Sequence, residues 1–358
     1  MSLSLKRRIL SAALAVTLTA SAAAVGVGTV SAADNQFAEQ ITGYQNCNSQ
    51  LDLTQSARYL SGMTNPDGGV MEIVDYNAKT GWAYAVNGQR GYITAVPVNN
   101  IEHNDKVTLL DGIDIDVKAL VEPYGISYGD MTSVAVSPDG ENLAVAIQAE
   151  DYAANGAAAV FSCNDDGTLT LHYVASTGVQ PDMIMYTPDG SKILTANEGE
   201  PRQGYSDGAV DPMGSVTVIN AATGESENVD FTSFDSKETR LALVNGGVVL
   251  KKDTAPSVDL EPEYIAATNS TAYISLQEAN AVAVLSLDTN TYKGVYSVGF
   301  EDYSKYAVDI DKKDEKYAPK TYDSLRGIRM PDGISLVTID GTDYLLTANE
   351  GDSRLLQQ

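Results

Sequence analysis

From Val70 onward, short runs rich in Val, Ile, Tyr and Thr alternate with Gly, Asn, Asp and Pro. This pattern is typical of short β-strands joined by tight turns. Two segments, 133–140 and 183–190, each combine a strand with a Pro-Asp-Gly turn and lie 50 residues apart. The same pattern predicts further strands over 143–147, 157–161, 169–174, 193–197, 215–220, 225–231, 264–267, 272–276, 281–287, 294–298, 334–339 and 344–348.

Four short strands in about 50 residues are the period of a β-propeller blade. A less regular first unit starts at Val70, and later units start near Thr132, Asp182, Glu263 and Asp332. The sequence therefore predicts an all-β propeller of about four and a half four-stranded blades, from which we expect a C-terminally truncated chain. A two-sheet sandwich could also supply short strands, but it does not explain the 50-residue repeat. The best helix candidate is the segment 53–60.

The N-terminus has a pattern of its own. Lys6, Arg7 and Arg8 precede an apolar, alanine-rich run over 9–30, which ends in small residues. These features predict a secretory signal peptide over 1–33, although the run is also long enough for a retained membrane anchor. A lead-in segment over 34–65 and a propeller domain over 66–358 follow.

Charge narrows the function classes. Removal of the signal peptide leaves 20 basic against 48 acidic residues, a formal net charge of −28. Nucleic acids and anionic membranes require basic patches, so neither is an expected partner. We expect a secreted, extracellular protein whose ligand is an unidentified extracellular or cell-wall component. Export also permits a disulfide between Cys47 and Cys163.

One acidic motif occurs twice. Thr195-Ala196-Asn197-Glu198-Gly199-Glu200 returns as Thr347-Ala348-Asn349-Glu350-Gly351-Asp352. In addition, three units open with Pro and an acid and place a Glu 15 to 18 residues later, which pairs Asp182 with Glu198, Glu263 with Glu278, and Asp332 with Glu350. Because a hairpin returns to the edge where it started, we expect these six acids to gather at one end of the propeller.

Strand alternation adds further acids, because residues i and i+2 of a strand share a face. Like charges about 4 Å apart repel by roughly 4 kcal/mol at an effective dielectric constant near 20, so such a group needs compensation. Carboxylates without His or Cys favour Ca²⁺, with Mg²⁺ as the alternative. The predicted ligands are Asp182, Glu198, Glu200, Asp259, Glu261, Glu263, Glu278, Asp332, Glu350 and Asp352. The competing interpretation is that each acid is a solvated turn residue.

Two arginines accompany the repeated motif. Arg202 and Arg354 each follow the repeated Glu by four residues. They could serve as internal counter-ions, or they could contact an anionic ligand, since Arg binds phosphate and carboxylate bidentately.

Several linked motifs carry a family resemblance. They are Met71-Glu72-Ile73-Val74, Tyr84-Ala85-Val86-Asn87-Gly88, Pro181-Asp182-Met183, the segment 195–201, the segment 259–265, Leu276-Gln277-Glu278-Ala279-Asn280 and the segment 347–352. Over roughly 65–354 the chain resembles the choice-of-anchor I family of exported bacterial proteins, which is similar to the mesenchyme-specific cell surface glycoproteins of animals. The resemblance implies a propeller-like extracellular domain joined to a C-terminal surface anchor. Members are often labelled alkaline phosphatase-like.

Two functions follow as hypotheses. The first is an acidic, Ca²⁺-binding extracellular interaction module. The second is a metal-dependent phosphoesterase, in which the same carboxylates hold cations that activate water and Arg202 or Arg354 contacts the phosphate. The sequence assigns no nucleophile.

Overall fold

A computed structural model describes residues 54–64, 69–99, 101, 106–204, 208–311 and 313–351. The predicted signal peptide and Cys47 lie outside these residues, so the predicted Cys47–Cys163 disulfide stays a prediction. Cys163 has no disulfide partner among the residues that the structure describes. None of the helices in the described ranges is long and apolar enough to cross a membrane.

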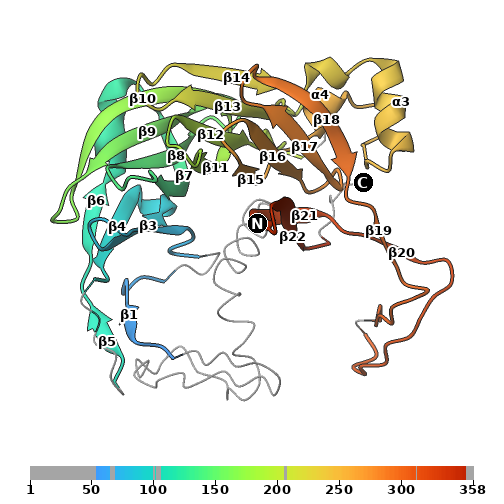
Figure 1. The fold of residues 1–358 in the computed structure, drawn as a ribbon, viewed down its shortest axis with the longest axis horizontal. Helices are drawn as coiled ribbons and strands as arrows, with labels where there is room; N and C mark the ends of the chain where they lie inside the picture. Colours follow the sequence, from blue (N-terminus) through green and yellow to red (C-terminus); the bar gives the residue numbers. More distant parts are fainter. Residues whose placement is uncertain are drawn as a thin grey trace. The chain divides into compact units, whose positions relative to one another are not determined.

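The described chain folds into four four-stranded sheets and three two-stranded ones (Figure 1). The first four-stranded sheet contains β2 (Val74–Asn77), β3 (Trp82–Asn87), β4 (Tyr92–Pro97) and β6 (Ile113–Asp116). The second contains β7 (Tyr128–Val136), β8 (Asn142–Ala149), β9 (Asn155–Cys163) and β10 (Leu169–Val179). The third contains β11 (Pro181–Tyr186), β12 (Lys192–Asn197), β13 (Ser215–Asn220) and β14 (Ser226–Asp230). The fourth contains β15 (Ile265–Ala267), β16 (Thr271–Leu276), β17 (Ala281–Ser286) and β18 (Thr291–Ser297).

The smaller sheets are strand pairs. They are β1 (Ala57–Tyr59) with β5 (Thr108–Leu110), β19 (Phe300–Asp302) with β20 (Arg326–Ile328), and β21 (Pro331–Ile339) with β22 (Thr342–Asn349). The helices are α2 (Val117–Val121), α3 (Lys237–Asn245) and α4 (Pro256–Asp259), with 3-10 turns η2 (Gly88–Arg90), η3 (Glu122–Tyr124) and η4 (Thr232–Phe234). Four-stranded meanders are the blades of β-propellers, so the predicted all-β chain built from such blades is confirmed.

The chain divides into two compact units. The first comprises 1–152, 156–176 and 184–186, and the second comprises 153–155, 177–183 and 187–358. In the first unit, apolar side chains of β3, β4, β7, β8 and β9 form one core, in which Tyr84, Ile93, Leu143 and Phe161 are fully buried. This core follows directly from the alternation of apolar residues along the strands.

In the second unit the third, fourth and β21–β22 sheets are neighbours, because β15 contacts both β12 and β21. Leu194, Ile274 and Leu285 are fully buried there. Near the outer strands, Phe231 stacks on Tyr292 with 4.4 Å between ring centroids and an interplanar angle of 19°. All the sequence-predicted acids that the structure describes lie in this unit.

Two helix assignments differ from the sequence prediction. The predicted helix over 53–60 is wrong, because Ala57–Tyr59 form β1, which pairs in parallel with β5. The sequence also did not predict α3. Its local signal is Ser236, whose side chain accepts a hydrogen bond from the Thr239 backbone N–H and so caps the helix.

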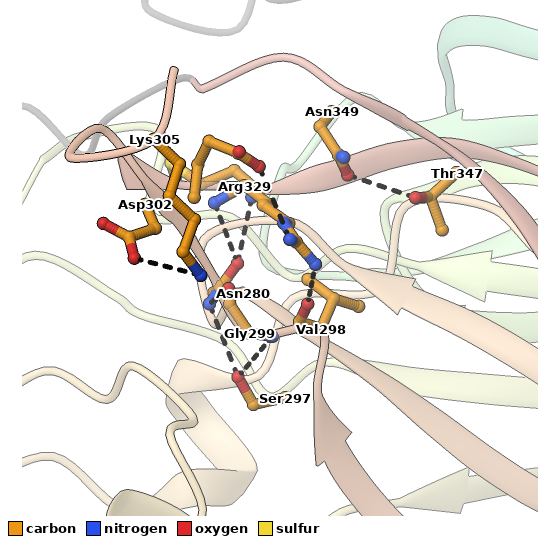
Figure 2. Close-up of polar contacts among 11 residues, drawn as sticks. Asn280, Ser297, Val298, Gly299, Asp302, Lys305, Arg329, Thr347 and Asn349 are labelled. Atoms are coloured by element: carbon orange, nitrogen blue, oxygen red, sulfur yellow. Dashed lines mark hydrogen bonds and ion pairs between the residues drawn. The ribbon is translucent and has the colours of Figure 1, made fainter. Parts of the chain in front are cut away.

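Asn280 joins three segments of the second unit (Figure 2). Its Oδ1 accepts hydrogen bonds from the backbone N–H groups of Arg329 and Met330, both at 3.1 Å. Its Nδ2 donates to the Gly299 carbonyl at 2.9 Å and to Ser297 Oγ at 3.4 Å. Asn280 itself has a left-handed φ of 52°, and its side chain fixes the backbone just before Pro331 and Asp332.

We expect Asn280→Ala to destabilise the chain by about 2–4 kcal/mol, since it removes these bonds and leaves a buried backbone N–H unpaired. The measurement is urea denaturation. Asn290→Ala is the matched control, because Asn290 is also left-handed (φ 49°) but its side chain donates one bond, to Glu227. Equal losses in the two variants would contradict a joining role for Asn280.

Candidate functional site

Two strand ends bring Pro-acid pairs together with the repeated Glu. The backbone N–H of Glu198, directly after β12, donates to the carbonyl of Gln180 at 2.9 Å, and Gln180 immediately precedes the Pro181-Asp182 pair. In the β21–β22 sheet the equivalent bond runs from the Glu350 N–H to the Met330 carbonyl at 3.1 Å. The hairpins therefore return each Glu to the place where its Pro-acid pair begins.

The backbone around these acids is unusual. Gln180 and Met330 both have a φ of 55°, although each precedes a proline, where extended conformations are the norm. Gly199 (φ 66°) follows Glu198 directly, and a Cβ there would lie 2.8 Å from the Met213 carbonyl oxygen. A non-glycine residue in this region is strained by about 1–3 kcal/mol, and such strain concentrates at functional sites.

The fourth sheet supplies a third pair by a different hydrogen-bond pattern. The Glu263 N–H donates to the Ser275 carbonyl at 3.1 Å, and the Ser275 N–H donates to the Tyr264 carbonyl at 2.9 Å. Glu278 follows the end of β16 by two residues and is buried. Glu263 and Glu278 thus also lie at the end where their hairpin starts and finishes.

Glu263 is the centre of the electrostatics. Its side chain is 6% exposed, and its Oε1 has no hydrogen-bond partner within the described chain. Burial raises the pKa of this carboxyl well above its ordinary value of 4.5. The negative charges of Glu198, Glu278, Asp332 and Asp182, in that order, raise the pKa further. Four acids next to strands of three sheets are therefore close enough to act on Glu263.

Tyr264 connects the sixth acid to this group. Burial raises the pKa of its phenol, and Asp332, Asp182, Glu263 and Glu350 raise it further. We call these six acids the carboxylate cluster: Asp182, Glu198, Glu263, Glu278, Asp332 and Glu350. It consists of the three Pro-acid residues and the three later Glu residues that the repeat singled out.

The other predicted ligands have different surroundings. Asp259 ends the short helix α4 and accepts a hydrogen bond from the Lys251 backbone N–H. Glu200 and Glu261 are buried, but neither is among the main influences on the pKa of Glu263 or Tyr264. The alternation that grouped them is wrong, because β12 ends at Asn197 and β15 begins at Ile265, so these residues are not in strands. Asp352 lies outside the described residues.

Of the two arginines, only Arg202 lies in the described part of the chain. Its Nε donates to Gln180 Oε1 at 3.0 Å, and Gln180 Nε2 donates to the Glu200 carbonyl at 2.8 Å. Arg202 therefore supports the turn that carries Asp182. Arg354 lies outside the described residues, and an anion contact for either arginine stays a prediction.

The donor chemistry of the cluster suits a hard cation. All six side chains offer carboxylate oxygens, and the buried Oε1 of Glu263 still has room for a bond. Among the described residues, however, no three acidic, histidine or cysteine side chains already form a metal-ligand set. A shared cation would therefore require some of these side chains to turn about their own dihedral angles.

The sequence analysis assigned no role to the groups that support the cluster. Gln180 and Met330 take the left-handed conformation, Asn280 holds Met330, and Tyr264 lies among the acids. The one local signal is the proline after Gln180 and Met330, which marks an unusual turn without giving its conformation.

Solved structures with some likeness to this chain include several propeller and lactonase-like proteins. A protein from Lactobacillus plantarum is 15% identical with a TM-score of 0.41, and the match covers 63% of this chain and 56% of that one. The Cps50 (Swd1) β-propeller domain of Myceliophteria thermophila is 10% identical with a TM-score of 0.39, covering 64% and 61%. A putative 6-phosphogluconolactonase from Bacteroides uniformis is 12% identical with a TM-score of 0.38, covering 69% and 61%. The chain thus spans less than two thirds of each of these proteins.

A search of curated proteins gave no match. The choice-of-anchor I domain, in contrast, matches residues 72–357, which include both four-stranded sheets of the first unit and the whole carboxylate cluster. The chain belongs to the choice-of-anchor I domain family.

Proposed function

We propose that this protein is a secreted or cell-surface interaction module whose carboxylate cluster binds Ca²⁺. The single observation that carries the proposal is the buried Glu263 carboxyl, with an unpartnered oxygen and four neighbouring acids that all raise its pKa. A buried carboxylate among like charges is unfavourable unless it is protonated or meets a cation.

The geometry favours calcium over magnesium. Mg²⁺ requires near-ideal octahedral coordination and keeps several waters, whereas Ca²⁺ accepts six to eight oxygens in variable arrangements. The six carboxylates come from three separate sheets, so an irregular, all-oxygen shell is what they can supply. Glu198, Glu263, Glu278 and Asp332, all buried, are the expected principal ligands.

The predicted export of the protein supports both Ca²⁺ as the ion and an extracellular interaction as the function. Membership of the choice-of-anchor family suggests an exported protein, in agreement with the predicted signal peptide. Extracellular calcium is abundant, so a weak site would be filled there. The strong negative charge makes a basic or neutral extracellular ligand a better partner than an anionic polymer.

Calorimetric titration with Ca²⁺ in the absence of other divalent ions should give a Kd of about 10⁻⁴ to 10⁻³ M, as in extracellular modules. Glu263→Gln should weaken binding by about tenfold or more, since it replaces a charged ligand by a neutral one. Glu225→Gln is the matched control, because Glu225 is an exposed loop residue just before β14 and its replacement should leave the affinity unchanged.

Two results would count against this function. If the titration shows no heat of calcium binding, and the Tm is the same in calcium and in chelator, calcium binding would be contradicted. Metal-dependent hydrolysis of p-nitrophenyl phosphate that is lost in Glu263→Gln would favour the phosphoesterase hypothesis over the interaction module.

The metal-free chain should lose stability as pH rises. Because the folded-state pKa of Glu263 lies above 4.5, the native state holds this proton more tightly than the unfolded state. Its contribution is therefore fully present below pH 4.5 and is lost as pH rises through the folded-state pKa. Each tenfold difference in proton affinity between the folded and unfolded states corresponds to about 1.4 kcal/mol of stability.

Urea denaturation in chelator between about pH 4 and 8, compared with the same series on Glu263→Gln, isolates this effect. The variant should show the smaller decline, because its amide does not titrate. Parallel curves for the two proteins would show that Glu263 is not held protonated, and saturating calcium should flatten the wild-type curve.

A further inference from the structure

A methionine that follows β1 lies against the turn η2 of the first four-stranded sheet. Met63 Sδ accepts hydrogen bonds from Arg90 Nη1 at 2.9 Å and from Asn87 Nδ2 at 3.7 Å. A thioether sulfur is a weak acceptor, whereas guanidinium and amide groups are good donors. Two good donors therefore meet at one atom that satisfies them poorly.

The fold holds both donors in place. Asn87 is 2% exposed and directly precedes η2, where an Asn side chain usually caps the backbone, yet this side chain makes no capping hydrogen bond. Tyr128 Oη fixes the turn by donating to the Gly88 carbonyl at 2.6 Å. The Arg90 guanidinium lies over the Tyr92 ring, 5.4 Å from its centroid. An oxygen acceptor in the place of the sulfur would therefore gain bonds from donors that are already positioned.

There is room for an additional atom beside the sulfur. A cavity of about 280 Å³ is lined by Met63, Thr64, Val70, Asn87, Gln89 and Arg90. One water molecule occupies about 30 Å³ of liquid, so the cavity is much larger than an oxygen atom needs. Met63 is partly exposed and Arg90 is exposed, so a small solute can reach the sulfur from the solvent.

We propose that Met63 is a modification site, and that its oxidation by peroxide fixes the segment 54–64 to the turn η2. The sulfur lone pair attacks one oxygen of hydrogen peroxide, the O–O bond breaks, and the other oxygen leaves as water. The sulfur thereby loses two electrons and gains an S–O bond, which makes Met63 a sulfoxide. The new oxygen accepts the N–H groups of Arg90 and Asn87 in place of the sulfur.

The predicted effect has the opposite sign to ordinary oxidative damage. Oxidation of a methionine usually disrupts packing, because a polar group replaces an apolar one. At Met63 the polar group meets two donors, so the segment should become more stable. Methionine sulfoxide reductases reverse this chemistry, and the site can therefore act as a switch. This inference goes beyond the proposed function and does not depend on the metal.

The test compares the whole chain before and after treatment with hydrogen peroxide, and mass spectrometry of its peptides confirms one added oxygen on Met63. Backbone amide exchange of the segment 54–64 should become about fivefold slower in the oxidised chain, since a weak contact is replaced by a net hydrogen bond. Arg90→Met should remove most of this slowing, because it retains an unbranched side chain but has no donor. Arg90 is exposed, so the fold should tolerate the change.

Two further variants assign the effect to one methionine. Met63→Leu should show no slowing after the same treatment. Met213→Leu is the matched control, because Met213 is 45% exposed and belongs to the second unit, so the slowing should be retained. Unchanged or faster exchange in the oxidised wild-type chain would overturn the proposal. So would full slowing in Arg90→Met, or a Met63 that stays unoxidised under conditions that oxidise Met213.

Discussion

The main physical constraint on the second unit is the electrostatic repulsion between acids that the fold buries together, because this repulsion must be compensated. Two carboxylates about 4 Å apart repel by roughly 4 kcal/mol at an effective dielectric constant near 20, and burial adds a desolvation cost. The Glu263 carboxyl meets both conditions, because it is buried and four other acids act on it. A proton or a cation is the available compensation. In the function proposed above, the cation takes this role, and in its absence the raised pKa of Glu263 favours a bound proton.

The backbone near the cluster has an unusual conformation that is fixed by hydrogen bonds. Gln180 and Met330 have the left-handed conformation, and the carbonyl of each accepts the N–H of the returning Glu. Asn280 adds side-chain bonds to the backbone before Met330, and Arg202 binds the Gln180 side chain. These local strains persist because the surrounding hydrogen bonds over-determine them. The backbone next to the cluster is thus held by hydrogen bonds from Asn280, Arg202 and the returning Glu residues.

The sheets of this unit also show how hydrogen bonding defines a strand's place. In the third sheet, one Asn on the second strand connects to hydroxyl and amide groups on the next two, which makes that strand interior. Within the described residues, the same Thr-Ala-Asn sequence on β22 belongs to a strand that pairs with β21. In the third sheet the motif thus has two roles, since Asn197 connects β12 to β13 and β14, and Glu198 belongs to the acidic cluster.

Much of the architecture was determined by the sequence alone. Strand alternation and Pro-Asp-Gly turns are local, so the strands of the second, third and fourth four-stranded sheets were predictable, and β13 has the predicted bounds. The repeat spacing likewise identified the six acids of the cluster, since a hairpin must return to its starting edge. Only the tertiary structure determined the features that depend on contacts between distant residues. Strand alternation does not group Asp259, Glu261 and Glu200 with the six acids of the cluster, because none of these three residues is in a strand. Asp259 ends the helix α4, β12 ends before Glu200, and β15 begins after Glu261. The pairing of β1 with β5 overrode a weak helix signal. Above all, burial of Glu263 among acids from three sheets depends on contacts between residues far apart in the chain, and no local pattern specifies such contacts.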